Sequence, residues 1–354
     1  MTETRLPENP RILIIKPSAL GDICHALPVL AFLRSKFPKA YICWLVNRSF
    51  ASLLSGLESL DEIIAFDRGA FSKGIWAGLK SWSELSRSLR SKPWDLVLDL
   101  QGLARSGLMT RLTPSKRRWG LSDCREGSWL AYTRRVQVQP GENHAVERYW
   151  QFARALGASE KSEIPNLVLP KEAVTKAEIA LARLPRPWFV VAPGARWVTK
   201  RWPPGGFACV VNELVNNHGG SACIVGAPDE AELGDQLAAA LSVPFANLVG
   251  KTSLLEMAGI LGKADLVLAN DSGPLHVAVA LGRKVVSPFF CTKPVLTGPY
   301  GHEDGTIWTP RACRGSLVRL CPTSMECFAE LNWSKVHQVA ELIFAKMPYK
   351  GSPE

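Results

Sequence analysis

Residues 12–30 read ILIIKPSALGDICHALPVL, and this stretch decides the fold. The four apolar residues at 12–15 predict a buried strand, and a turn follows at 17–21. The spacing of the next apolar residues predicts a helix from about Asp22 to Lys36. A continuous apolar strand followed by a helix is typical of a parallel sheet that helices cover on both faces.

The same alternation continues along the chain and then restarts. Apolar runs predict further strands at 40–46, 62–66 and 96–100 in the first half, and at 188–192, 222–225, 266–269 and 285–289 in the second. An extended run at 164–170 and a helix at 171–184 separate the halves, so the boundary lies near 165–187. We therefore predict an α/β protein with two doubly wound, Rossmann-like domains facing each other across a cleft.

Composition and charge narrow the class of protein. The chain has 354 residues, enough for two ordinary domains, with 47% hydrophobic and 21% charged residues, which excludes disordered, collagen-like and coiled-coil proteins. The net charge of +10 is uneven: residues 1–150 hold 22 Lys and Arg against 14 Asp and Glu, a balance of +8, and the rest holds +2. We expect an anionic partner to meet the first half.

The sequence also bears on location. No apolar run reaches the roughly 18 residues of a membrane span, and charged residues interrupt the N-terminus before a signal peptide could form. The nine cysteines include no C-x-x-C pair, which indicates a reducing cytoplasm. Cys313, Cys321 and Cys327 form the one local group. Their spacing fits no standard zinc pattern, so we favour structural thiols over a metal site.

One segment of the first half is both basic and apolar. It reads FSKGIWAGLKSWSELSRSLRS (71–91) and has apolar residues at helical spacing. Those apolar residues are Ile75, Leu79, Trp82, Leu85 and Leu89, and the basic ones are Lys73, Lys80, Arg87 and Arg90. Such a helix suits a membrane surface. A helix that covers the sheet is the alternative, and we favour it.

Ligands of doubly wound sheets bind beyond the carboxyl ends of the strands, so residues that follow strands are candidates. After the first strand, Gly21 lets another group approach the backbone closely. Asp22 opens a helix whose dipole and free N–H groups keep a carboxylate ionised, as a general base requires. A simple N-cap is an equally good interpretation of Asp22.

The second half offers weaker candidates after two of its strands. Gly194 permits a tight turn, and Lys200 is an ammonium suited to phosphate, although a solvated pair with Arg201 explains it equally well. Glu230 is a candidate acceptor for ribose hydroxyls. Acidic residues are common in the first turn of any helix, so this signal is weak alone.

The strongest segment is LVLANDSGPLHVAVALGRKVV (266–286), a strand followed by an Ala- and Val-rich helix. Gly273 exposes backbone N–H groups, Pro274 suits a first helical turn, and the helix dipole points at the ligand edge, which predicts a phosphate site. A well-capped buried helix would explain Asp271 and Pro274 but not His276.

Two familiar nucleotide motifs are excluded: G-x-G-x-x-G is absent after a strand, and Phe245 stands where a P-loop ending in Gly250-Lys251-Thr252 requires glycine.

Taken together, these segments resemble glycosyltransferase family 9, the ADP-heptose:lipopolysaccharide heptosyltransferases, which are inverting enzymes of the GT-B fold. The resemblance is carried by ILIIKPSALGDICHALPVL (12–30), DLVLDLQGLARSGLMTRL (95–112), HAVERYWQFARALG (144–157), VAPGARWVTKRWP (191–203), GAPDEAE (226–232) and NDSGPLHVAVALG (270–282).

The resemblance implies roles for individual residues. Asp22 is implied as the catalytic base that deprotonates the acceptor hydroxyl, and no metal or other cofactor is implied. The implied donor-binding residues are Gly194, Ala195, Lys200, Glu230, Asp271, Ser272, Gly273 and His276, with the diphosphate near Lys200 and the ribose at Glu230. Gln101, Arg105 and Arg125 lie in segments like those that face the acceptor.

We therefore expect an acceptor-binding domain at 1–172, a nucleotide-sugar domain at 173–330, and a C-terminal helix at 331–354 that packs back on the first domain. The expected reaction moves heptose from ADP-heptose to an anionic, lipid-linked acceptor, the lipopolysaccharide inner core. The expected place is the cytoplasm, with peripheral contact to the inner membrane and no nucleic-acid partner. The alternatives are a related enzyme that uses another nucleotide sugar for a different surface glycan, and a non-catalytic nucleotide- or glycan-binding module.

Overall fold

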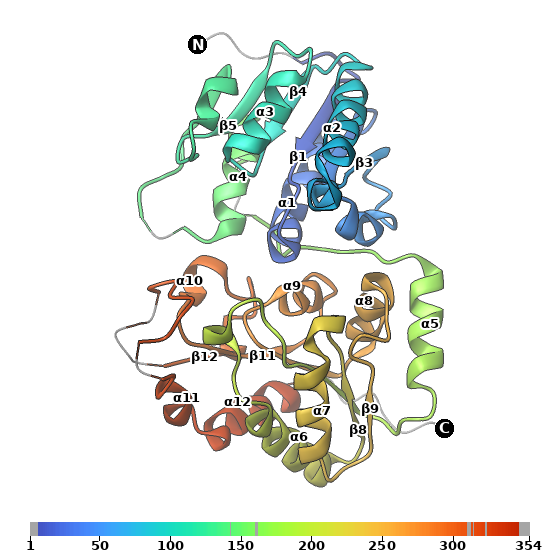
Figure 1. Ribbon diagram of the computed structural model, residues 1–354, viewed down its shortest axis with the longest axis vertical. Coiled ribbons are helices and arrows are strands. Elements are labelled where there is room, and N and C mark those ends of the chain that lie inside the picture. Colours follow the sequence, from blue (N-terminus) through green and yellow to red (C-terminus); the bar gives the residue numbers. More distant parts are fainter. Residues whose placement is uncertain are drawn as a thin grey trace. The chain divides into compact units, whose positions relative to one another are not determined.

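The structure is a computed structural model that describes residues 6–141, 143–159, 162–309, 313, 315–322 and 324–346. The chain forms two compact units, residues 1–168 and 169–354. Each unit contains one six-stranded sheet whose paired strands are all parallel (Figure 1). This is the two-sheet α/β architecture predicted from the alternation of apolar runs and helices.

The first sheet has the strand order β3-β2-β1-β4-β5-β6. Its strands are β1 (Arg11–Ile15), β2 (Tyr41–Asn47), β3 (Glu62–Phe66), β4 (Leu96–Asp99), β5 (Arg118–Leu121) and β6 (Arg134–Val136). Its helices are α1 (Leu20–Lys36), α2 (Ile75–Arg90), α3 (Ala104–Leu112) and α4 (Ala145–Ala155), with the short 3-10 segments η1 (Arg48–Leu54), η2 (Arg68–Lys73) and η3 (Ser128–Ala131). Helix α1 packs on α4, and α2 packs beside α3.

The second sheet has the order β12-β11-β10-β7-β8-β9. Its strands are β7 (Trp188–Ala192), β8 (Ser221–Ile224), β9 (Phe245–Asn247), β10 (Leu266–Ala269), β11 (Val285–Phe289) and β12 (Thr306–Trp308). Its helices are α5 (Lys171–Leu181), α6 (Pro204–His218), α7 (Ala231–Ala240), α8 (Leu254–Lys263), α9 (Gly273–Ala280), α10 (Pro294–Thr297), α11 (Cys327–Glu330) and α12 (Trp333–Ala345), with η4 (Val198–Lys200), η5 (Pro228–Glu230) and η6 (Glu303–Gly305).

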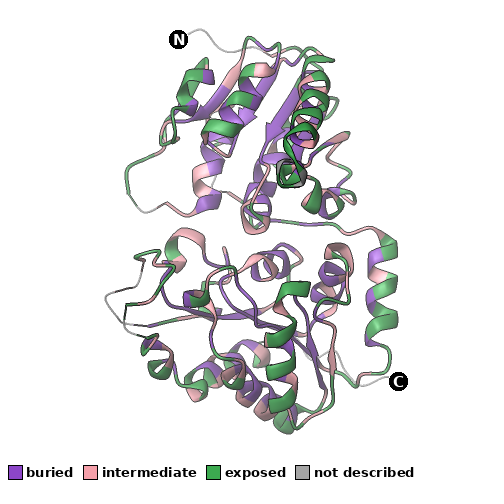
Figure 2. Ribbon diagram, viewed as in Figure 1, coloured by how far each residue is buried: buried purple, intermediate pink, exposed green. Residues whose placement is uncertain are grey.

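Each sheet builds its own core because its central strands are apolar on both faces. All four inner residues of β1 and every residue of β7 are buried. In the first unit, one core joins β1, β2 and β4 to Leu85, Leu89 and Met109 of α2 and α3. Figure 2 shows this contrast between buried strands and the exposed outer sides of the helices. Burial of this continuous apolar surface is what holds each sheet between its helices.

The last described helix belongs to the core of the second unit. Helix α12 packs on α6 and β11 of its own unit, and the expected packing of the C-terminal segment on the first domain stays a prediction. The contact with α6 follows from the apolar side of α12: Val336, Ala340 and Ile343 belong to the core that α6 and the second sheet share. Of the expected C-terminal segment 331–354, residues after 346 lie outside the described part of the chain.

The strand order fixes where ligands bind. In each sheet the chain runs outward in one direction and then in the other, so the order reverses between β1 and β4 and between β7 and β10. Ligands of doubly wound sheets bind at the carboxyl edge beside such a reversal. The residues that follow β1, β4, β7 and β10 are therefore the first candidates for contact with a ligand.

Candidate functional site

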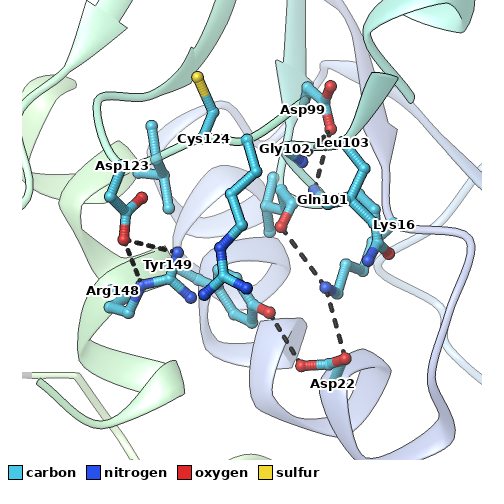
Figure 3. A pocket seen from close by; sticks show the side chains of 13 residues that line it. Lys16, Asp22, Asp99, Gln101, Gly102, Leu103, Asp123, Cys124, Arg148 and Tyr149 are labelled. Carbon is cyan, nitrogen blue, oxygen red and sulfur yellow. Dashed lines mark hydrogen bonds and ion pairs between the residues drawn. The ribbon is translucent and has the colours of Figure 1, made fainter. Parts of the chain in front are cut away.

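A pocket of about 230 Å³ opens at the carboxyl edge of the first sheet, beside the reversal between β1 and β4 (Figure 3). It brings together residues that follow β1, β4 and β5 and residues of α4. Its lining consists of Lys16, Asp22, Asp99, Leu100, Gln101, Gly102, Leu103, Leu121, Asp123, Cys124, Arg125, Arg148 and Tyr149. Three predicted site residues, Asp22, Gln101 and Arg125, thus line one pocket.

Asp22 lies in the first turn of α1, and its carboxylate is held from two sides. The backbone N–H of Ala19 donates to Oδ2 at 3.1 Å, and the hydroxyl of Tyr149 donates to Oδ1 at 3.0 Å. Burial raises the pKa of Tyr149 well above its usual value, so this hydroxyl stays protonated and remains a donor. The carboxylate is fixed in direction while 36% of the side chain stays exposed.

Lys16 places a buried positive charge behind Asp22. Its side chain is 2% exposed, its Nζ lies 3.7 Å from Asp22 Oδ2, and Nζ also lies over the ring of Tyr149. Burial lowers the pKa of Lys16, while the carboxylates of Asp22 and Asp99 oppose that shift. Since an opposite charge at this distance favours the ionised form of a carboxyl, Lys16 favours the form of Asp22 that accepts a proton.

Asp99 ends β4 and anchors the loop that carries Gln101. Its Oδ1 accepts the N–H groups of Gln101 and Gly102 at 2.9 and 3.0 Å, and its Oδ2 accepts the hydroxyl of Tyr132 at 2.7 Å. Burial raises the pKa of Asp99, and these hydrogen bonds oppose the shift. The side-chain Oε1 of Gln101 is buried without a hydrogen-bond partner. An unsatisfied buried acceptor of this kind is available to a ligand hydroxyl.

Cations occupy the other side of the pocket. Arg148 of α4 donates from Nε to Asp123 Oδ2 at 2.8 Å, and its Nη2 forms an ion pair with the same oxygen at 2.8 Å (Figure 3). Arg125 lines the pocket and is exposed. Arg105, which was expected beside them, lies exposed in the first turn of α3 and is not among the pocket residues. An arginine pair at one opening suits a substrate that carries carboxylate or phosphate.

A second cluster lies at the carboxyl edge of the other sheet, around Asp271. Lys200 Nζ lies 2.6 Å from Asp271 Oδ2, Thr292 donates to the same oxygen at 2.7 Å, and His276 Nε2 lies 3.7 Å from Oδ1. Burial by itself raises the pKa of Asp271, but His276 and Lys200 outweigh it and hold that pKa at about 2. Three residues of the predicted donor site are thus in direct contact.

Glu230 and Gly194 form the second part of this edge, and the reason for the glycine differs from the prediction. Gly194 is not among the glycines with positive φ, so a tight turn does not explain it. Instead, a Cβ at this position would collide with the carboxylate of Glu230. Glu230 in turn accepts the N–H of Ala227 at 2.9 Å, and burial raises its pKa.

The start of α9 supplies the third part. Ser272 is the N-cap residue, but its side chain caps no N–H, and its Oγ is buried without a hydrogen-bond partner. Gly273 is the first helical residue. Asn270, buried just before them, ties the two loops together by accepting from Trp202 N and donating to Pro193 O. Ala195 lies on the first of these loops, where its carbonyl accepts from Arg201 Nε at 2.6 Å.

Several residues of both clusters were not predicted. Lys16 and Asp99 each end an apolar run, so the strand-end rule that selected Asp22 would also have selected them. Arg148 and Tyr149 lie in the quoted segment at 144–157, yet no spacing reveals a contact with a residue 127 positions earlier. Thr292 follows β11, but no pattern in the sequence marks its hydroxyl as a partner of Asp271.

The three clustered cysteines meet in the second unit. Cys313, Cys321 and Cys327 line a small cavity of about 20 Å³ together with Cys291. Burial is the main cause that raises the pKa of the Cys327 thiol to about 11, and the neighbouring thiols add to the shift. In the described ranges, no group of three or more His, Cys, Asp or Glu side chains has an arrangement that could hold a metal ion.

No helix formed by the described residues is long and apolar enough to cross a membrane.

Comparison with known sequences identifies the family. The profile of glycosyltransferase family 9 (heptosyltransferase) matches residues 82–326, more than half of the chain and parts of both units. The chain belongs to glycosyltransferase family 9. It is therefore an enzyme that transfers glycosyl groups, and its two parallel sheets are those of the GT-B fold expected above.

Named relatives of this glycosyltransferase match it over most of their length. It is 29% identical over 346 residues to lipopolysaccharide heptosyltransferase 1 of Pseudomonas aeruginosa, covering 92% of this chain and 96% of that one. It is 27% identical over 305 residues to the lipopolysaccharide core heptosyltransferase OpsX of Haemophilus influenzae, covering 85% of each. Among solved structures, the E. coli heptosyltransferase WaaC with ADP matches with a TM-score of 0.73 at 27% identity, over 94% of this chain and 99% of that one.

Proposed function

We propose that this glycosyltransferase transfers heptose from ADP-heptose to the inner core of lipopolysaccharide, with inversion at the anomeric carbon. The names of its relatives support the donor and the acceptor class. The observation that carries the proposal is the pocket that surrounds Asp22, because it combines a partly exposed carboxyl group with the cations that an anionic saccharide needs.

In this mechanism the acceptor enters the first unit's pocket. Arg125 and Arg148 attract its acidic groups, and the free oxygen of Gln101 accepts one of its hydroxyls. Asp22 takes the proton from the reacting hydroxyl, whose oxygen then bonds to the anomeric carbon of heptose as the bond to the ADP oxygen breaks. The leaving diphosphate gains negative charge, which Lys200 and the N–H groups at the start of α9 stabilise.

The donor is held by the second unit in this proposal. Gly194, Ala195, Ser272 and Gly273 present backbone around the diphosphate, Glu230 takes the ribose hydroxyls, and Asp271 with His276 orients Lys200 and the heptose. Lys200 is paired with Asp271 before any donor arrives. A diphosphate therefore joins an ammonium that is already fixed in position, at a low cost in side-chain entropy.

The proposal also covers the place of the reaction. The acceptor is lipid-linked, so we place the enzyme in the cytoplasm, with peripheral contact to the inner membrane. The excess of cations in residues 1–150 supports an anionic acceptor at the first unit. Raising the ionic strength should increase KM for the acceptor more than KM for the donor, since salt screens exposed charges. Charge reversal in Arg105→Glu or Arg125→Glu should act in the same direction.

The deciding experiment offers the purified enzyme ADP-heptose and a truncated lipopolysaccharide and follows the acceptor by mass spectrometry. We expect a gain of one heptosyl unit, and a rate lower by about 10²–10⁴-fold in Asp22→Ala. No mass gain, with donor binding intact, would indicate a non-catalytic binding module. Stronger thermal stabilisation by UDP or GDP than by ADP would indicate another nucleotide sugar.

A further inference from the structure

Of the eight large apolar side chains exposed in the described part of the first unit, six lie on α2, α3 and η3. They are Ile75, Trp76, Leu79, Leu108, Trp129 and Leu130. Trp76 is 81% exposed and Leu130 is 72% exposed. Single exposed apolar residues are ordinary on protein surfaces, whereas a gathered set of large ones marks a surface that binds something.

These six side chains come from segments that start at one edge of the sheet. Helix α2 follows β3, α3 follows β4, and η3 follows β5, and a helix that follows a parallel strand begins at the carboxyl end of that strand. The segments are neighbours: α2 packs beside α3 (Figure 1), and Gly107 of α3 approaches Ser128 of η3. We call these six residues the docking edge.

Helix α2 shows that the exposure is not needed for folding. Its second half covers the sheet, because Leu85 and Leu89 are buried in the first unit's core. In its first half, Ile75, Trp76 and Leu79 are exposed. The sheet-covering interpretation of this segment thus accounts for the second half of the helix and leaves the first half without a role.

The charge around the docking edge indicates its occupant. Lys80 follows Leu79 in the first half of α2, and Arg105 and Arg111 stand three residues before and three residues after Leu108 on α3; all three cations are exposed. Arg87 and Arg90 lie in the last turn of α2, away from Ile75 and Trp76. Apolar side chains at one end of a helix with cations beside them match the boundary of an anionic bilayer, where rings enter the acyl region and cations meet phosphates. An apolar protein partner would not call for the cations.

We propose that the docking edge binds the surface of a bilayer rich in anionic phospholipid. The inference deepens the proposed function and rests on it in one respect, namely that the acceptor is lipid-linked. The pocket of Asp22 and Gln101 opens at the same carboxyl edge of the same sheet. A bilayer held there presents a saccharide that projects from its surface to the pocket, without removal of the lipid from the membrane.

The test measures binding to vesicles without any donor or acceptor, so that its result is independent of catalysis. The full chain is sedimented with vesicles of phosphatidylcholine alone or of phosphatidylcholine mixed with anionic phosphatidylglycerol. We expect binding to the anionic vesicles that weakens with salt. Ile75→Ser/Trp76→Ser should bind at least about tenfold more weakly, and Lys80→Glu about fivefold or more. Ile179→Ser on α5, a comparably exposed apolar residue of the second unit, is the matched control.

Each outcome decides the proposal. Failure of the wild-type chain to sediment with anionic vesicles overturns it, as does equal weakening in Ile179→Ser. A dimer in solution that Ile75→Ser/Trp76→Ser dissociates assigns the surface to a second copy instead. Transfer to a water-soluble core saccharide should be unchanged in Ile75→Ser/Trp76→Ser. If the wild type transfers nothing to that saccharide yet binds vesicles, the proposed function fails while the docking edge stands.

Discussion

Replacing Lys16 by methionine should change the pH dependence of catalysis more than its maximum. Methionine fills a similar volume without the charge that lies 3.7 Å from the Asp22 carboxylate. At that distance the attraction amounts to about 4.5 kcal/mol for an effective dielectric constant of 20 and about 1 kcal/mol in bulk water. Because Asp22 is 36% exposed, we expect a value in the lower part of that range, about 1–3 kcal/mol.

The direction of the pH shift follows from the protonation equilibrium of Asp22, the proposed base. A positive neighbour favours the carboxylate, so its removal lets Asp22 take up a proton at a higher pH. About 1–3 kcal/mol corresponds to roughly one to two pH units. In a plot of log kcat/KM against pH, the acidic limb should therefore shift to higher pH by roughly one to two units. At high pH the activity should approach the wild-type value.

The assay is a series of initial rates between pH 5 and pH 9 with ADP-heptose and a truncated acceptor. The matched control is Lys92→Met, which removes a lysine paired with Glu62 in the same unit but away from the pocket. A purely structural role of Lys16 would lower the rate equally at every pH. That result, an unshifted profile with reduced height, would refute the reasoning.

Further substitutions test the second unit. Lys200→Ala should weaken ADP binding by about 10–100-fold in calorimetry, the loss of one charge-assisted hydrogen bond, and leave KM for the acceptor nearly unchanged. Gly194→Ala should displace the Glu230 carboxylate, the mobile end of that side chain, and should therefore weaken ADP binding while changing the free energy of unfolding by less than about 1 kcal/mol. Gly205→Ala, with open space around its Cβ, should leave both ADP binding and the urea midpoint nearly unchanged. The pKa of Asp271 is lowered from 3.8 to about 2 in the folded state, so its ionised carboxylate stabilises the fold by about 2 kcal/mol above pH 4, and this contribution is lost as the pH falls towards 2. The urea midpoints of the wild type and of Asp271→Asn should therefore converge in acid. A difference in midpoint that stays constant with pH would contradict the assignment.

The longer strands could be predicted because each is a continuous apolar run, which is visible in the sequence without knowledge of the strand that pairs with it. The strands at 62–66, 188–192, 266–269 and 285–289 lie where expected. The short strands β5, β6, β9 and β12 were missed. Strand β6 consists of Arg134, Arg135 and Val136, and only its pairing with β5 makes it a strand. Such strands depend on tertiary contacts, which no local pattern contains.

The candidate site divides in the same way. Asp22 and Asp271 could be found because residues at the ends of parallel strands converge at one edge. Gln101 and Arg125 came only from the resemblance to the family. The positions of Tyr149 and Arg148 could not be found, since they reach the pocket from a helix far along the chain. The glycine at 194 was selected for the wrong reason, because a collision with a side chain 36 residues later is visible only in three dimensions.

The repeated strand order has a consequence for how such enzymes diversify. Both sheets follow one plan, no strand of one sheet pairs with a strand of the other, and the chain divides between Val168 and Leu169. A recombinant gene that joins codons 1–168 to the remainder of a relative's gene would keep every strand pairing and leave the Asp22 and Asp271 clusters each whole. Under the proposed division of roles, such an exchange would replace the unit that binds the acceptor and keep the unit that binds the nucleotide sugar.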